Sequence, residues 1–451
     1  MNLHRLLAAR AAAGKPVRVG LIGAGKFGSM FLAQLAHTPG MDLAWIADLS
    51  PSGARAALDA TGWSTGRADA VRLGAYAAEL LDDDPPEVVI EATGDPAAGI
   101  DHALAAIGAG CHLVMVNVEA DVLAGPLLAA KAAEAGVVYS LAYGDQPGLI
   151  CELVDWARAC GFAVVAAGKG TKYRPEFHAS TPDTVWGHYG LSPEAAKAGG
   201  MNPQMFNSFL DGTKSAIEMA AVANATGLAV PVGGLAFPAI GTDRLADSLK
   251  PRSAGGSLDR AGMVEVISSE RHEGGAVAND LRWGVYVTFE APGDYTARCF
   301  GEYGIARDES GCFGALWRPS HLIGLELGIS VASAALRGEA TGAPTGFRGD
   351  VVAVAKRDLA VGEGLDGEGG YTVWGRLMPA ADSLAAGALP IGLAKDVLLV
   401  RSVAEGAVLT RDDVVLDEAS DLVRVRAEME ARFDPRVARD TKMDRNGRMA
   451  S

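Results

Sequence analysis

A glycine-rich turn near the N-terminus constrains the fold of this chain most strongly. The apolar run at residues 17–22 leads into Gly23-Ala-Gly25-Lys-Phe-Gly28, and an amphipathic stretch follows. A strand, a tight turn and a helix in this order place backbone N–H groups where they can face a pyrophosphate. Gly23 permits the turn, Gly25 lets a ligand approach the backbone, and Gly28 lets the helix pack closely on the strand. The pattern predicts dinucleotide binding rather than a purely structural turn.

An acidic residue after the next apolar run bears on the choice of coenzyme. Asp48 follows residues 43–47, at a position where a carboxylate can accept hydrogen bonds from the adenosine ribose. Its charge would repel a 2′-phosphate, which favours NAD. Ser50, Ser52 and Arg55 lie just beyond and could receive such a phosphate. We therefore expect NAD or NADP, with a slight preference for NAD.

Strand-like and helix-like segments alternate up to about residue 150, which is typical of a parallel sheet covered by helices on both faces. The expected elements are a leading helix at 2–13, strands at 87–92, 112–116 and 137–142, and helices at 97–108 and 126–135. Thr93 and Gly94 follow one strand and are expected near the nicotinamide half of the coenzyme. Asp95 and Pro96 equally fit a helix start, as cap and first residue. The predicted coenzyme contacts are Gly23, Gly25, Lys26, Phe27, Gly28, Asp48, Thr93 and Gly94.

The chain is too long for one ordinary core. The order of its strand-like and helix-like segments predicts an α/β protein with three domains and a tail. Residues 1–160 are expected to form a Rossmann-type doubly wound domain, and residues 161–345 an α+β substrate domain ending in an apolar helix at 321–336. Residues 346–430 read as a small β-rich module, in which 352–365 and 397–414 resemble each other. The charged residues 431–451 are expected to form a flexible tail.

The overall charge excludes several classes of partner. There are 40 Lys and Arg against 55 Asp and Glu, a formal charge of −15, which disfavours nucleic acids and anionic membrane surfaces. No apolar run reaches the roughly 18 residues of a membrane span. The five cysteines lack CxxC spacing, so a disulfide framework and a zinc site are not expected. These features predict a soluble cytoplasmic protein that takes a small molecule as substrate, and we expect a homodimer.

The densest candidate site follows a predicted strand. Lys169, Lys172, Arg174 and His178 fall within Gly168–His178, in an otherwise acidic chain. Such a loop can hold a phosphate or carboxylate through charge-assisted hydrogen bonds, so we expect an anionic substrate. The alternative is a solvated loop whose charges bind nothing.

A second candidate is an apolar helix that carries polar residues. Lys214 and Glu218 stand at i and i+4, shortly after Asp211, and form either a simple stabilising pair or part of a polar wall. A lysine held by an acid can supply the alcohol proton and stabilise charge on the oxygen during hydride transfer. Lys169, Lys172 and Lys214 are the candidates, with Asp211 or Glu119 orienting the lysine. His178 and His188 are competing acid–base groups, and a divalent metal is possible but has no compact ligand spacing to support it.

Taken together, these segments resemble a known group. The glycine turn, Asn117-Val-Glu119-Ala-Asp121, Lys169-Gly-Thr-Lys172-Tyr, Asp211-Gly-Thr-Lys214-Ser-Ala-Ile-Glu218-Met and the terminal module are similar to the homoserine-dehydrogenase-like oxidoreductases with a SAF domain, which include deoxyxylulose phosphate reductoisomerase-like proteins. The resemblance covers nearly the whole chain. It implies a nicotinamide coenzyme and, for those members, conversion of 1-deoxy-D-xylulose 5-phosphate to 2-C-methyl-D-erythritol 4-phosphate, a step of isoprenoid precursor synthesis.

The chain departs from that pattern at one position. Homoserine dehydrogenases and ordinary reductoisomerases carry Ala-Asn-Lys after this strand, and here Val118 stands in place of the lysine. The resemblance carries Asp211 and Lys214 over as catalytic residues. We therefore expect an NAD(P)-dependent oxidoreductase of a sugar or polyol phosphate. The alternatives are oxidation of homoserine or another hydroxy acid, and a non-catalytic nucleotide- or carbohydrate-binding protein.

Overall fold

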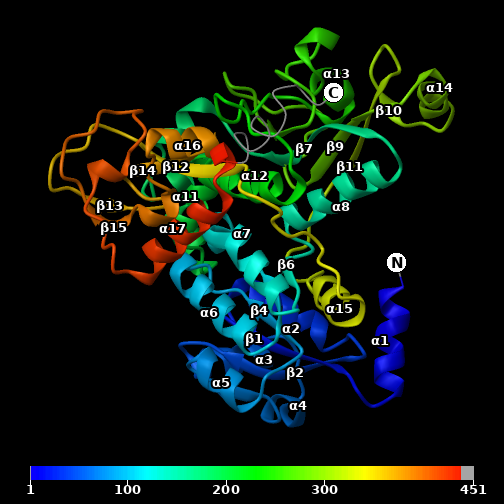
Figure 1. Ribbon diagram of the computed structural model, residues 1–451, viewed down its shortest axis with the longest axis vertical. Coiled ribbons are helices and arrows are strands. Elements are labelled where there is room, and N and C mark those ends of the chain that lie inside the picture. The colour runs from blue at the N-terminus through cyan, green and yellow to red at the C-terminus, as the bar shows by residue number, and fades with distance from the viewer. Residues whose placement is uncertain (1, 438–451) are drawn as a thin grey trace. The chain divides into compact units, whose positions relative to one another are not determined.

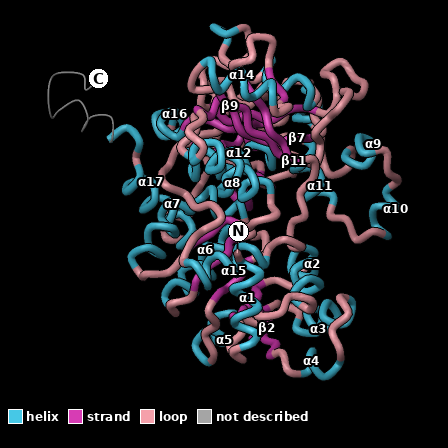
Figure 2. The backbone as a smooth tube through the Cα atoms, turned by 90° about the vertical axis from the view of Figure 1, so that its right-hand side faces the viewer, coloured by secondary structure: helices cyan, strands magenta, loops and turns pink. Residues whose placement is uncertain are grey.

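The computed structural model describes residues 2–437, which form two compact units (Figure 1, Figure 2). The first unit comprises the chain up to Glu152 together with His321–Thr345, and the second comprises Leu153–Ser320 together with the chain from Gly346. The sequence analysis grouped residues 321–345 with the substrate domain and treated residues 346–430 as a third module. The contacts group these segments with the first and the second unit, respectively. Residues 438–451 of the expected tail lie outside the described residues.

The first unit is built on a parallel sheet, which confirms the expected Rossmann-type fold. Its six strands run in the order β3-β2-β1-β4-β5-β6, and every pairing is parallel. This order reverses direction between β1 and β4, the place where open α/β sheets bind ligands at the carboxyl ends of their strands. The strands are β1 (Val17–Ile22), β2 (Met41–Ala47), β3 (Arg72–Gly74), β4 (Val88–Glu91), β5 (His112–Met115) and β6 (Tyr139–Leu141).

Helices cover this sheet and complete its core (Figure 1). Helix α15 lies against β1, β4, β5, β6, α1 and α2, and its Val331 and Ala332 share one buried cluster with Phe31 and Leu32 of α2. The helices of this unit are α1 (Leu3–Ala12), α2 (Lys26–Leu35), α3 (Pro51–Ala60), α4 (Thr65–Asp69), α5 (Ala77–Asp83), α6 (Pro96–Gly108), α7 (Val118–Glu134) and α15 (Gly328–Arg337), and α8 (Gln146–Ala159) begins here.

Two helix boundaries differ from the sequence expectations. Helix α7 begins at Val118, not at Pro126, because the Asn117 side chain accepts a hydrogen bond from the N–H of Ala120 and caps an earlier start. Pro126 lies inside this helix. Helix α15 begins at Gly328, seven residues after the expected start at His321. A regular apolar spacing therefore predicted the helices but not their ends.

The second unit contains a mixed sheet. Its strands run in the order β10-β11-β9-β7-β8, with β7 and β8 parallel and the other pairs antiparallel. The strands are β7 (Ala163–Thr171), β8 (Met263–Ser268), β9 (Val285–Glu290), β10 (Ala306–Arg307) and β11 (Phe313–Arg318). The chain from Gly346 adds the antiparallel pairs β12 (Gly349–Ala355) with β14 (Val373–Pro379) and β13 (Gly364–Asp366) with β15 (Lys395–Leu398).

Helix α12 occupies the centre of this unit. It contacts β7 and β8 on one side and β12 and β14 on the other, and it is buried along most of its length, as its apolar flanks predicted. Its start is fixed by Gly212, whose φ of 92° interrupts the helical conformation between α11 and α12. The helices are α9 (Val185–Tyr189), α10 (Pro193–Ala198), α11 (Pro203–Leu210), α12 (Thr213–Thr226), α13 (Leu245–Ser248), α14 (Asp294–Glu302), α16 (Ala380–Ala386) and α17 (Asp421–Phe433), with short 3₁₀ helices η1 (Pro175–Ala179), η2 (Thr242–Arg244), η3 (Arg252–Ala254), η4 (Ile391–Leu393) and η5 (Arg411–Asp413).

None of the helices within residues 2–437 combines the length and the apolar character needed to cross a bilayer.

Candidate active site

The glycine turn after β1 has the shape of a pyrophosphate cradle. Gly23 adopts a φ of 90° and donates its N–H to the carbonyl of Ala47 at 2.8 Å. A Cβ atom on Gly28 would lie 2.2 Å from the carbonyl oxygen of Gly23, so only glycine fits there. A Cβ on Gly25 would meet nothing within 4 Å. Gly25 is thus not required by packing, and the space beside it is open to a ligand.

The adjoining strand end contributes the second half of this cradle. A Cβ on Gly23 would lie 2.8 Å from the carbonyl oxygen of Ala92, so the turns after β1 and β4 are in contact. Thr93 and Gly94 are exposed there, and the buried Glu91 accepts a hydrogen bond from the N–H of Thr93 at 3.2 Å. Asp95 caps α6 through the N–H of Ala98, so the helix-start interpretation also holds.

Asp48 is held beside the turn by two backbone hydrogen bonds. Its Oδ2 accepts from the N–H of Ala24 at 2.9 Å, and its Oδ1 accepts from the N–H of Ser50 at 2.8 Å. The carboxylate is therefore oriented at the end of β2, where the ribose is expected. Lys26 is exposed and Phe27 half-buried in the first turn of α2.

The open space at Gly25 gives a sharp test of the cradle. We expect Gly25→Ala to weaken NAD(H) or NADP(H) binding about tenfold or more in calorimetry, because the new methyl group occupies space that the pyrophosphate needs. The melting temperature should stay within error, since φ at Gly25 is −66° and no atom lies within 4 Å. Gly66→Ala, an exposed glycine of α4 with equally open surroundings, is the matched control. Unchanged affinity in Gly25→Ala would contradict the placement of the pyrophosphate.

In the second unit, a buried ion pair joins strand β7 to helix α12. The ammonium of Lys169 on β7 donates to Oε2 of Glu218, and the two side chains are only 6% and 4% exposed. Among the described residues, Glu218 is the only partner of Lys169, so two N–H groups of the ammonium remain available. The sequence placed Lys169 in a loop, whereas it lies within β7, two residues before that strand ends.

The other cations of this stretch gather around Glu270. Lys172 Nζ lies 3.0 Å from Glu270 Oε1 and donates to the carbonyl of His188 at 2.7 Å. Arg174 Nε lies 3.7 Å from Glu270 Oε2. Within the described residues, this buried Nε has no hydrogen-bond acceptor. An acceptor oxygen of an anionic ligand would satisfy it.

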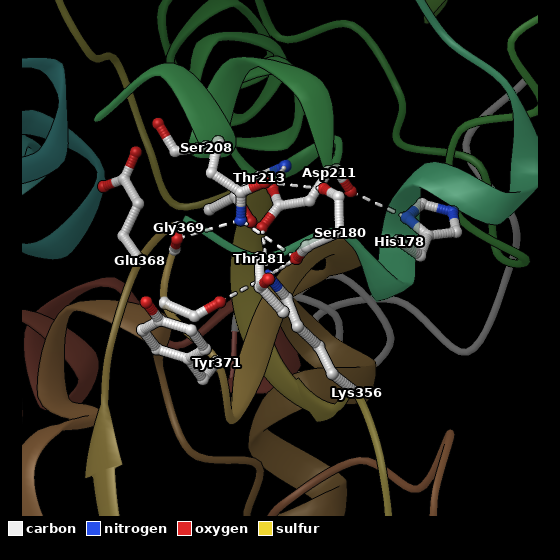
Figure 3. Close-up of polar contacts among 12 residues, drawn as sticks. His178, Ser180, Thr181, Ser208, Asp211, Thr213, Lys356, Glu368, Gly369 and Tyr371 are labelled. Atoms are coloured by element: carbon white, nitrogen blue, oxygen red, sulfur yellow. Dashed lines mark hydrogen bonds and ion pairs between the residues drawn. The ribbon is translucent and has the colours of Figure 1, made fainter. Parts of the chain in front are cut away.

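A second polar cluster surrounds Asp211, at the junction of α11 and α12 (Figure 3). Asp211 Oδ1 accepts from the N–H of Thr213 at 2.9 Å, and Oδ2 lies 2.8 Å from the ammonium of Lys356. The carbonyl of Asp211 can only accept, so Nδ1 of His178, 2.7 Å away, is the donor. Asp211 is fully buried, and its ionic partner comes from a segment distant in the sequence.

His178 is held as a neutral ring. Its Nε2 accepts from the hydroxyl of Tyr173 at 2.9 Å, and the ring stacks on Trp374 with centroids 3.8 Å apart. Burial lowers the pKa of His178, while the hydrogen bond to the carbonyl of Asp211 opposes that shift. Burial also raises the pKa of Tyr173 to about 12. Both ring nitrogens are thus engaged. His188, the other histidine candidate, is half-buried and has a pKa lowered by burial and by the nearby Arg174 and Lys172.

The predicted catalytic residues belong to both units. Lys169, Lys172, Asp211 and Lys214 all belong to the second unit, and Lys214 is half-buried on α12. Glu119 belongs to the first unit, in the first turn of α7. Glu218 pairs with Lys169, and Asp211 pairs with Lys356.

The sequence analysis missed Glu270, Trp374 and Lys356. The one available signal for Lys356 was that both similar segments, 352–365 and 397–414, place a basic residue at the same point. Those residues are Lys356 and Arg401, and Arg401 pairs with Asp413. Within the described residues, no three His, Cys, Asp or Glu side chains gather in a way that could hold a metal ion.

Two family models match separate parts of the chain. Residues 17–119 match the NAD-binding Rossmann fold of the GFO_IDH_MocA oxidoreductase family, and residues 144–327 match the catalytic domain of oxidoreductase DRL. The first unit thus carries an NAD-binding Rossmann domain of the oxidoreductase type. The catalytic part of the chain is similar to that of oxidoreductase DRL, and the segment from Gly346 lies outside both matches.

Solved structures resemble the chain only distantly. A homoserine dehydrogenase from Thiobacillus denitrificans is 21% identical over 48% of this chain and 50% of its own, with a TM-score of 0.36. The WlbA dehydrogenase from Bordetella pertussis, solved with NADH and UDP-GlcNAcA, is 22% identical over 36% of this chain and 48% of its own, with a TM-score of 0.27. A myo-inositol dehydrogenase from Lactobacillus casei is 16% identical over 38% and 50%, with a TM-score of 0.29. The chain therefore spans about half the length of these structures. No curated protein matches it significantly.

Proposed function

We propose that this oxidoreductase acts on a small anionic substrate, a sugar or polyol phosphate, in a reductoisomerase-like reaction. The observation that carries the proposal is the buried Lys169–Glu218 pair at the end of β7. A lysine in this position can donate a proton to the substrate oxygen or remove one, while Glu218 fixes its orientation. The bound nicotinamide supplies or accepts the hydride.

The anionic character of the substrate is supported by the cations beside this pair. Lys172 and Arg174 both lie against the carboxylate of Glu270, and Arg174 also pairs with Glu176 at 2.8 Å, yet the Nε of Arg174 lacks an acceptor among the described residues. A guanidinium can bind two oxygens of a phosphate or carboxylate at once, so Arg174 is assigned to the anionic group. Lys172 adds a second positive charge at that position.

A substrate panel tests the proposal. Nicotinamide absorbance is followed with 1-deoxy-D-xylulose 5-phosphate, other sugar and polyol phosphates, sugar acids and homoserine, each with NAD(H) and NADP(H), with and without magnesium. We expect turnover with a phosphorylated substrate. Turnover of homoserine or an unphosphorylated acid alone would overturn the substrate class, and coenzyme binding in calorimetry without any turnover would favour a nucleotide-binding protein. A homodimer in solution is part of the same proposal, and light scattering tests it.

A further inference from the structure

Polar side chains of α11 and α12 bind the backbone of the segment formed by residues 346–379, here called the β12–β14 segment. These side chains are buried or half-buried, and they bind main-chain N–H and carbonyl groups of the segment. The contacts are Gln204 Nε2 to the carbonyls of Asp366 (3.0 Å) and Glu368 (2.9 Å), Asn207 Nδ2 to the carbonyl of Gly369 (2.9 Å), the N–H of Gly375 to Thr213 Oγ1 (2.8 Å), and the N–H groups of Arg348 (2.7 Å) and Gly349 (2.9 Å) to Asn224 Oδ1. Such specific pairing of backbone groups indicates a fixed attachment.

Lys356 lies in this segment, directly after β12, and its ammonium binds two carbonyls and one carboxylate. Nζ donates to the carbonyls of Ser180 and Gly370, both at 2.7 Å, and lies 2.8 Å from Oδ2 of Asp211 (Figure 3). Two of its three N–H groups are thus bound by carbonyls, and the contact with Asp211 is an ion pair, since Oδ2 has no hydrogen-bond donor among the described residues. The side chain is 2% exposed, and that of Asp211 is 0% exposed. Lys356 is therefore unsuited to proton transfer, in contrast to Lys169.

The contact of Lys356 with Asp211 links the β12–β14 segment to the first residue of α12. The second oxygen of Asp211 binds the N–H of Thr213, the first residue of α12. Glu218, which orients Lys169, lies on the same helix. The β12–β14 segment also contributes Trp374, which packs on His178, whose Nδ1 donates to the carbonyl of Asp211. The segment thus fixes the beginning of the helix that carries the orienting carboxylate.

We propose that Lys356 is a positioning residue for the reaction and that catalysis in the second unit requires the β12–β14 segment. The ammonium fixes Asp211, Asp211 fixes the first turn of α12, and α12 holds Glu218 against Lys169. This inference rests on the proposed function, because Lys169 is the acid–base group only in that reaction. The β12–β14 segment lies outside residues 144–327, which match the known catalytic domain, so the inference adds residues beyond that match to the catalytic machinery.

The test compares Lys356→Met with the double variant Lys356→Met/Asp211→Asn. The single variant leaves the buried Asp211 without its cation, so a lower melting temperature is expected, and the double variant removes both charges and should regain stability. We expect kcat of the folded enzyme to fall about 10- to 100-fold in both variants, because a misplaced catalytic group slows the reaction, with KM changing less than about threefold. Lys395→Met, an exposed lysine of β15, is the matched control.

Two outcomes would overturn the positioning role. One is normal kcat in folded Lys356→Met, and the other is a double variant that regains stability and kcat together, as a purely structural pair would. Amide hydrogen exchange in the first turn of α12, expected to be faster in Lys356→Met, gives a readout that does not depend on activity. If the wild type turns over no substrate while exchange still responds to Lys356→Met, the ordering of α12 by Lys356 is supported and the failure belongs to the proposed function.

Discussion

We expect Lys169→Met to lower kcat by about 10²- to 10⁴-fold, the range for loss of a positioned general acid or base. The ammonium of Lys169 is buried, is oriented by Glu218 and has two N–H groups without an acceptor among the described residues, so the variant loses proton transfer and oxygen stabilisation together. Coenzyme affinity should stay unchanged, because the predicted coenzyme contacts belong to the first unit. Steady-state kinetics with the substrate found in the panel, together with calorimetry for the coenzyme, provide the measurement.

Burial of Glu218 requires a second variant as control. Lys169→Met leaves an unpaired carboxylate in the core and therefore lowers stability, whereas Lys169→Met/Glu218→Gln removes both charges. The double variant should fold well and remain as inactive as the single one. Lys197→Met, an exposed lysine of α10, should behave as the wild type. A Lys169→Met enzyme that keeps its kcat, beside a Lys214→Met enzyme that loses it, would transfer the acid–base role to Lys214.

The coenzyme fold was predictable from the sequence because its signals are local. The glycine turn, the strand before it and the acid after the next strand lie between residues 17 and 48, and each acts on its immediate neighbours. Gly23 needs a positive φ and Gly28 needs contact with the carbonyl of Gly23, both within the same turn. The structure confirms the parallel sheet that this pattern predicted.

The ion pairs of the second unit were not predictable from local signals, because their partners are distant in the sequence. The i,i+4 spacing of Lys214 and Glu218 indicated either a stabilising pair or part of a polar wall. It gave no sign that Glu218 is bound by Lys169, which comes from a strand 49 positions earlier. Periodicity along a helix shows which residues share a face, but it does not show which strand packs against that face. The same holds for Lys356, whose role depends on where the β12–β14 segment meets α11 and α12.

The second large effect is expected in the first unit, at Asp121 of the Asn117-Val-Glu119-Ala-Asp121 run. This side chain is fully buried on α7, accepts the hydroxyl of Tyr139 at 2.7 Å through Oδ1, and has no partner for Oδ2 among the described residues. Burial raises the pKa of Asp121 from 3.8 to about 7, and the Tyr139 hydroxyl only partly opposes this. The folded chain therefore keeps a proton that the unfolded chain releases between these two values.

The sign of the pH effect follows from that difference. Because Asp121 binds its proton more tightly when folded, its stabilising contribution is complete below about pH 4 and is lost as the pH rises through about 7. Asp121→Asn keeps the acceptor for Tyr139 and cannot ionise, so near pH 8 the variant should be more stable than the wild type, by at most about 4 kcal/mol for a shift of roughly three units. Near pH 4 the two should differ little. Urea unfolding at both pH values measures this, with the exposed Asp101→Asn as control. A stability difference that does not change with pH would show that Asp121 is ionised in the folded chain, and the buried carboxyl would then need a partner cation close to Oδ2.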